Sequence, residues 1–134
     1  MTVLFGDLAP LVLHVVGDYV TQSDWMAQRK VSSWGPALAH GLVYTIPFGL
    51  LTQSVVALAF IFGTHVVIDH WRLARYVCWA KNFLSPRKGW PKPWAMCKGT
   101  GYNPETPPFL AVWLMIITDN LMHVACNAIA LAYL

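Results

Sequence analysis

Four apolar segments of this 134-residue chain each carry two polar side chains spaced four residues apart. The pairs are His14 and Asp18, His40 and Tyr44, His65 and Asp69, and Asp119 and His123. Residues i and i+4 share one face of a helix, so each pair presents both of its groups from one side. We therefore expect the four pairs to meet in one polar site to which every helix contributes.

Imidazole and carboxylate groups together suit Zn²⁺, with Mn²⁺ or Fe as alternatives. Helical bundles build such sites from inward-facing side chains on separate helices. The predicted ligands of one metal ion or two are His14, Asp18, His65, Asp69, Asp119 and His123. His40 and Tyr44 would be catalytic or would support the ligands. The same residue types also suit a proton relay, or hydrogen bonds that only hold helices together.

The segments that carry these pairs are long apolar blocks, at about 3–20, 37–52, 54–70 and 108–134. The chain is 57% hydrophobic and 11% charged, whereas soluble domains carry about 25% charged residues. The blocks lack the alternation of strands. We expect an all-α polytopic membrane protein, a single domain over residues 1–134 with four transmembrane helices. The second and third blocks would form a helical hairpin, kinked near Pro47 and Gly49.

The lengths of the blocks give weaker support to four transmembrane helices, because a span needs about 20 residues. A soluble helical bundle, which would accept shorter helices, is the alternative. The N-terminus lacks a basic stretch before its apolar residues, so we expect no cleaved leader. All nine Lys and Arg lie in two segments, 21–36 and 71–107. The positive-inside rule then places both segments in the cytoplasm and both termini outside, in a bacterial inner membrane.

The connection 71–107 is basic and rich in Trp and Pro. Residues 71–84 are expected to form a continuing or interfacial helix. Residues 85–108 hold six of the nine prolines and cannot form a long helix. We expect this connection to contact anionic lipid headgroups, and no nucleic acid, because no recognition motif accompanies the charge. A homo-oligomer is compatible with these features.

Four segments carry a family resemblance: HVVGDYVTQSDWMAQRK (14–30), AHGLVYTIP (39–47), THVVIDH (64–70) and TDNLMH (118–123). They resemble a family of small four-helix membrane proteins of bacteria and phages, catalogued as domain of unknown function 3307. The first segment is the most specific, since it places His14, Asp18, Gln22, Trp25 and Lys30. The resemblance covers about 1–70 and 109–134, and this chain departs from the family pattern in a longer 71–107 connection.

The resemblance implies a fold and a membrane location but no activity. More distantly, the His and Asp pattern is similar to that of inner-membrane proteins described as metal-dependent hydrolases. The leading expectation is metal-dependent hydrolysis of a lipid-linked or membrane-embedded substrate, in which water attacks a phosphoester, ester or amide. A proton or divalent-cation transporter or channel is the second possibility. The third is a phage-type membrane assembly or host-interaction protein without enzymatic activity.

Overall fold

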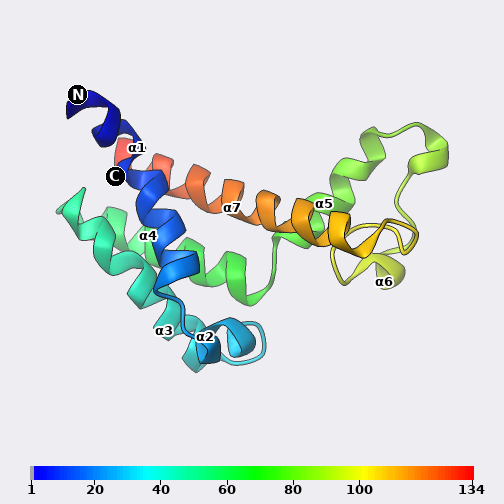
Figure 1. Cartoon of the computed structure of the whole chain (residues 1–134), viewed down its shortest axis with the longest axis horizontal. Coiled ribbons are helices and arrows are strands. Elements are labelled where there is room, and N and C mark those ends of the chain that lie inside the picture. The colour runs from blue at the N-terminus through cyan, green and yellow to red at the C-terminus, as the bar shows by residue number, and fades with distance from the viewer. Residues whose placement is uncertain (1) are drawn as a thin grey trace. The chain divides into compact units, whose positions relative to one another are not determined.

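The computed structural model describes the backbone of residues 2–134 and the side chains of residues 8–134. Every regular element in this part of the chain is helical and none is a strand, so the all-α prediction is confirmed. The α-helices are α1 (Thr2–Val15), α2 (Asp24–Arg29), α3 (Trp34–Thr45), α4 (Val55–His70), α5 (Ala74–Lys81), α6 (Trp94–Cys97) and α7 (Pro108–Tyr133) (Figure 1). Four shorter elements are the π-helical turn η1 (Val16–Val20) and the 3-10 turns η2 (Ile46–Leu50), η3 (Asn82–Leu84) and η4 (Arg87–Gly89).

The chain divides into two compact units. The first unit holds residues 1–71 and 123–134, and the second unit holds residues 72–122. The long helix α7 begins in the second unit and ends in the first. This division does not test whether residues 1–134 form a single domain, which stays a prediction.

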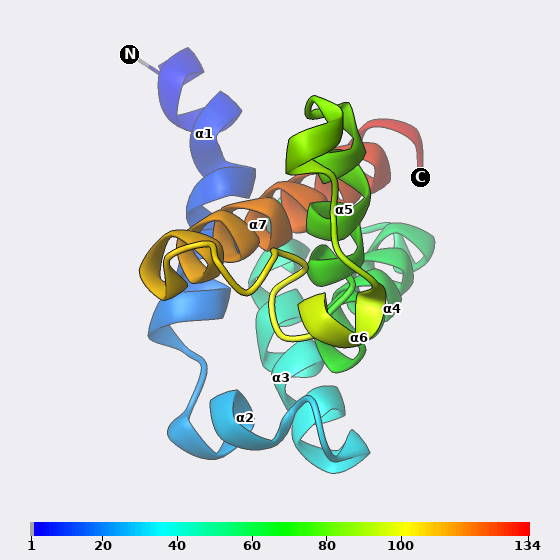
Figure 2. The ribbon, with the colours of Figure 1, turned by 90° about the vertical axis from the view of Figure 1, so that its right-hand side faces the viewer.

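The predicted hairpin of the second and third blocks is confirmed in the first unit. η2, which contains Pro47 and Gly49, separates α3 from α4, and both ribbon views show these helices side by side (Figures 1 and 2). A Cβ atom at Gly41 would collide with a methyl group of Val66, so the bare backbone of Gly41 permits the close approach of α3 to α4.

The first apolar block is not one regular α-helix, because η1 interrupts it. The Thr21 amide donates to the Val16 carbonyl at 2.9 Å, a hydrogen bond that spans five residues. Such π turns change the direction of the side chains that they carry and are frequent at functional sites. Asp18 lies within this turn.

The end of α7 completes the core of the first unit. Tyr44, Phe48, Ala57, Ile61 and Ala130 form a fully buried apolar cluster, which joins α3, η2 and α4 to α7. The last residue is fixed as well, because the Ser54 hydroxyl at the start of α4 donates to the carbonyl of Leu134 at 2.8 Å. The C-terminal part of α7 is therefore held where its side chains face the hairpin.

Four transmembrane helices are not supported by the helix lengths. Among the described helices, α7 alone is long and apolar enough to cross a membrane, with 26 residues and a mean hydropathy of 1.6. Only 11% of its most apolar window is buried, whereas the core helix of a soluble protein is mostly buried. α1, α3 and α4 have 14, 12 and 16 residues, below the about 20 that a span needs. A multi-pass location stays a prediction.

The second unit confirms that residues 85–108 form no long helix. Between Ser85 and Pro107 only η4 and the four-residue α6 occur, and α7 begins at Pro108. Side chains hold this segment: Trp79 of α5 donates to the Lys92 carbonyl at 2.9 Å, and the Lys92 amide donates to Asn103 at 2.7 Å. The expected helix over 71–84 begins later, at Ala74, because Arg72 has a φ of 49° and cannot continue α4.

Candidate metal centre

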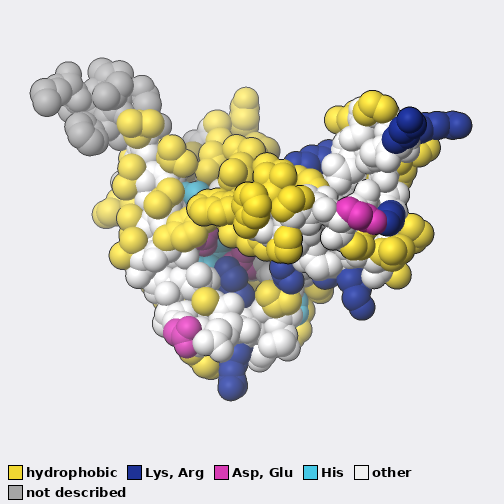
Figure 3. All heavy atoms as spheres, turned by 45° about the vertical axis from the view of Figure 1, so that its right-hand side comes forward, with side chains coloured by type: hydrophobic (Ala, Val, Ile, Leu, Met, Phe, Trp, Pro, Cys, Tyr) yellow, Lys and Arg dark blue, Asp and Glu magenta, His cyan; other side chains and the backbone are white. Residues whose placement is uncertain are grey.

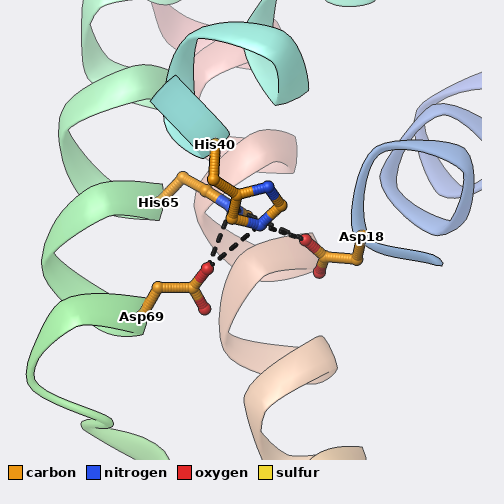
Figure 4. Close-up of side chains that lie close together, drawn as sticks. All are labelled: Asp18, His40, His65 and Asp69. Carbon is orange, nitrogen blue, oxygen red and sulfur yellow. Dashed lines mark ion pairs between the residues drawn. The ribbon is translucent and has the colours of Figure 1, made fainter. Parts of the chain in front are cut away.

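Four buried side chains of the first unit point toward one another: Asp18 of η1, His40 of α3, and His65 and Asp69 of α4 (Figure 4). One ligand atom of each lies within 4.8 Å of the ligand atoms of the others. His40 Nε2 lies 3.2 Å from both Asp18 Oδ1 and Asp69 Oδ2. His65 Nε2 lies 3.5 and 3.2 Å from the same two oxygens. Three segments that are distant in the sequence thus converge on one cluster.

The spacing of these atoms fits a metal ion. With zinc bonds of about 2.0–2.2 Å and tetrahedral angles, neighbouring ligand atoms lie about 3.3–3.6 Å apart. Within the described part of the chain, no group makes a well-aligned hydrogen bond to His40 Nε2, His65 Nε2 or Asp18 Oδ1. Buried polar atoms normally have a partner, and a cation between these atoms would supply one.

Both carboxylates of the cluster favour their ionised form. Burial raises the pKa of Asp18, but the imidazoles of His40 and His65 beside it lower the pKa more, to below 3.8. Burial opposes ionisation of Asp69 too, yet its contacts with His123, His40 and His65 hold its pKa well below 3.8. The cluster therefore presents two negative charges at neutral pH.

The two imidazoles have opposite tendencies. Burial lowers the pKa of His40, but the adjacent carboxylates of Asp18 and Asp69 raise it to above 6.5. Burial dominates at His65 and lowers its pKa to about 4. His65 is accordingly neutral at pH 7, which is the form that binds metals, whereas the adjacent carboxylates favour the protonated form of His40, with which a metal ion would compete.

A lysine also reaches the cluster. Lys30, just after α2, places its Nζ 2.7 Å from Asp69 Oδ2, and its side chain is 18% exposed. His70 Nδ1 donates to the Lys30 carbonyl at 2.7 Å, and the ring of Trp34 stacks on His70 at 3.9 Å. The end of α4 thus fixes the backbone that carries Lys30. His70 therefore contacts the Lys30 backbone and the Trp34 ring.

Two further histidines contact the carboxylates from the sides. His14 Nδ1 lies 3.5 Å from Asp18 Oδ2, and His123 Nε2 lies 3.3 Å from Asp69 Oδ1. Both rings are buried. These contacts orient the carboxylates, and they leave the opposite oxygens, Asp18 Oδ1 and Asp69 Oδ2, facing His40 and His65.

Tyr44 positions the ligands through its ring and its hydroxyl. The ring stacks on His65 with centroids 3.6 Å apart. The hydroxyl accepts a hydrogen bond from Asn127 at 2.6 Å and lies 2.8 Å from His14 Nδ1. A Cβ atom at Gly17 would collide with the Tyr44 ring, so a glycine is needed where η1 passes it. Tyr44 is fully buried, and its contacts hold His65 and His14 in position.

The structure distributes the predicted residues differently from the sequence analysis. His40, predicted to be catalytic, lies among the four convergent groups, whereas His14 and His123 lie beside them. Asp119 belongs to the second unit, so its part in the site stays a prediction.

Sequence reasoning assigned no role in the site to Lys30 or Asn127. Lys30 ends the most specific motif, and Asn127 follows His123 by four residues on α7, so it continues the spacing of the polar pairs. Both signals were present in the sequence, but neither shows a contact by itself.

The fold and the site define a small all-α protein with a buried cluster of histidines and aspartates. The chain belongs to the family DUF3307, described as a protein of unknown function, which it matches over residues 8–133. This match confirms the family that the four sequence segments indicated, and it includes the 71–107 connection. No curated protein and no solved structure matches the chain.

Proposed function

We propose that this protein is a metal-dependent hydrolase that binds zinc, or alternatively manganese or iron, through Asp18, His40 and His65. Two imidazoles and one carboxylate are a ligand set of hydrolytic zinc sites that keep a fourth position open. One observation carries the proposal. The facing atoms of these three residues are buried, lie at ligand spacing and have no well-aligned hydrogen-bond partner in the described structure.

A bound ion of this kind lowers the pKa of a water to about 7, which makes a nucleophile available at neutral pH. Asp69 Oδ2 lies 3.2 Å from the Nε2 atoms of both His40 and His65, so it faces the same space. In the proposed mechanism Asp69 accepts a proton from the attacking water as general base. His123 holds the other oxygen of this carboxylate.

Lys30 would stabilise the negative charge that develops on the substrate. Its ammonium group is close to Asp69, and its partial exposure places it where a substrate would arrive. A fixed cation beside the reacting oxygen stabilises the transition state more than it stabilises the uncharged ground state. This arrangement suits attack on an ester or a phosphoester.

We propose a lipid-linked substrate and a location at the bacterial inner membrane. The support is the exposed apolar surface: Leu50 is 83% exposed, Val55 78%, Phe109 71% and Leu121 63%. Large apolar side chains exposed to this extent are typical of surfaces that a partner or lipid covers. Membrane lipid is the cover that agrees with the apolar character of α7.

Metal analysis of the purified full chain tests the site. We expect about one equivalent of ion in the parent protein and a loss of ion in Asp18→Asn and His65→Gln. Asp69→Asn should keep the ion but lose hydrolysis of chromogenic ester and phosphodiester substrates. Asp24→Asn is the matched control, because Asp24 is exposed on α2 and contacts Gln28. A parent protein without zinc, manganese or iron would contradict the proposal.

A transporter of protons or divalent cations is the second candidate. Five buried acid and imidazole groups follow one another inside the unit with no step longer than 3.5 Å: His14, Asp18, His40, Asp69 and His123. Proton pathways use such series. Flux into proteoliposomes that Asp69→Asn abolishes, in a protein without hydrolytic activity, would favour transport over hydrolysis.

A further inference from the structure

The turn between α5 and α6 exposes apolar side chains at its end. We define residues 82–90, which contain η3 and η4, as the apolar tip. Leu84 is 90% exposed, Phe83 44% and Trp90 42%. Exposed turns ordinarily carry Gly, Pro, Asn, Asp or Ser at such positions. Three large apolar side chains on one nine-residue turn therefore need an explanation.

The apolar tip is a structured turn. The Trp90 indole donates to the Ser85 carbonyl at 2.9 Å, and the Ser85 amide donates to the Asn82 carbonyl at 3.2 Å. The rings of Phe83 and Trp90 meet edge to face, with centroids 5.6 Å apart. The Phe83 and Trp90 rings are therefore held in place before any partner arrives, which lowers the entropy cost of binding.

Cations surround these apolar groups. Lys81 precedes the tip, Arg87 and Lys88 lie within it, and the Arg87 guanidinium lies 5.5 Å from the centre of the Trp90 ring. The second unit has seven Lys and Arg against two acids, a net charge of +5. Figure 3 shows yellow and dark blue side chains close together at the upper right of the view, on the side where Figure 1 places this turn.

We propose that the apolar tip inserts into the interface of a bilayer that contains anionic lipid. Phe83, Leu84 and Trp90 enter the boundary between headgroups and acyl chains, and Arg87 and Lys88 bind lipid phosphates. Aromatic groups with adjacent cations are typical of this layer, and each cation near an anionic surface strengthens binding roughly fivefold. The positive charge of the whole unit favours this occupant over an apolar protein groove. The inference is independent of the metal site.

Site-directed spin labelling of the full chain in proteoliposomes tests the insertion. The label is placed at Leu84→Cys in a Cys126→Ser background, because Cys78 and Cys97 are buried. The control label is at Ala95→Cys, an exposed position of α6 in the same unit. The bilayers are pure phosphatidylcholine, or equal parts of phosphatidylcholine and phosphatidylglycerol.

In the phosphatidylglycerol bilayers we expect the label at position 84 to collide readily with oxygen and rarely with a water-soluble nickel chelate. The label at position 95 should keep high accessibility to the chelate. The double charge reversal Arg87→Glu, Lys88→Glu should lower the ratio of molecules with an inserted tip to molecules with the tip in water. We expect a decrease of at least roughly fivefold for each cation removed. Lys98→Glu, an exposed cation outside the tip, should change this ratio far less.

Two results would overturn the inference. High chelate accessibility at position 84 in both bilayers would show a tip in water. Low accessibility to both oxygen and chelate would show a tip buried against protein, either a second copy of the chain or another partner.

Discussion

Lys30 gives the sharpest test of the charge balance in the cluster. Lys30→Met removes the ammonium group that lies 2.7 Å from Asp69 Oδ2 while keeping the length of the side chain. In the metal-free protein this leaves a buried carboxylate without its cation. Loss of one partner of a buried ion pair typically costs about 3–5 kcal/mol. Because the Lys30 side chain is 18% exposed, we expect the lower end of that range, about 3 kcal/mol.

The same substitution should strengthen metal binding. An ion bonded near Asp69 Oδ2 would lie about 4–5 Å from Nζ, and a dication at about 5 Å from a unit charge is repelled by roughly 6–7 kcal/mol at an effective dielectric constant of about 20. The flexible lysine stem can turn toward solvent and relieve most of this repulsion. We therefore expect a gain of about 2 kcal/mol, or about 30-fold tighter binding. Stability and metal affinity should change in opposite directions.

Two measurements decide the outcome. Urea unfolding of the metal-free protein gives the stability, and competition with a chromophoric chelator gives the affinity for zinc. Lys30→Arg should restore both values, and Lys92→Met, which breaks the exposed pair with Glu105, is the matched control. A Lys30→Met protein that binds zinc as tightly as the parent, or more weakly, would refute the proposed place of the ion beside Asp69.

Three further predictions concern the groups around the cluster. The pKa of His65 is lowered to about 4, so the folded state resists a proton that the unfolded state accepts below about pH 6.5. Between about pH 7 and 4 the metal-free parent protein should therefore lose about 3 kcal/mol of stability relative to His65→Gln. Urea unfolding measures this loss. Tyr44→Phe keeps the ring stacked on His65 but removes the hydroxyl that contacts His14 and Asn127. The free energy of unfolding should fall by about 2–4 kcal/mol, and the zinc content should stay unchanged. Gly41→Ala places a methyl group against Val66. We expect it to lower the free energy of unfolding by about 1–3 kcal/mol and to weaken zinc binding, measured by competition with the chelator. Gly35→Ala, whose added methyl group meets no atom within 4 Å, should change neither value.

The i, i+4 spacing predicted much of the site because the helices that carry the pairs are real. His65 and Asp69 lie one turn apart on α4 and face the same space, as expected. The spacing could not separate ligands from supporting groups. His14 and His40 each begin a pair with this spacing, and only the close approach of α3 to α4 brings His40 to His65, with ring centroids 4.7 Å apart. That approach depends on Gly41, which no helical periodicity marks.

Apolar block length was a poorer guide to the fold. The first block contains a π-helical turn, and the second ends in a 3-10 turn, so neither forms a helix of the length predicted. Hydropathy measures how readily a segment leaves water, but it does not register a change of helix type inside the segment. The π-helical turn matters most, because it carries Asp18, which contacts both His40 and His65.

The charges of the cluster connect its fold to its proposed chemistry. With Asp18 and Asp69 ionised, Lys30 supplies one of the two positive charges needed for balance, and a proton on His40, which the adjacent carboxylates favour, would supply the other. A divalent ion in place of that proton changes the sum of these charges from zero to +1. The site then favours a bound anion, such as hydroxide or the phosphate of a substrate. Replacing either aspartate with asparagine makes this sum more positive by one, but only Asp18→Asn also removes a proposed ligand. Asp18→Asn should therefore release the ion, whereas Asp69→Asn should retain it.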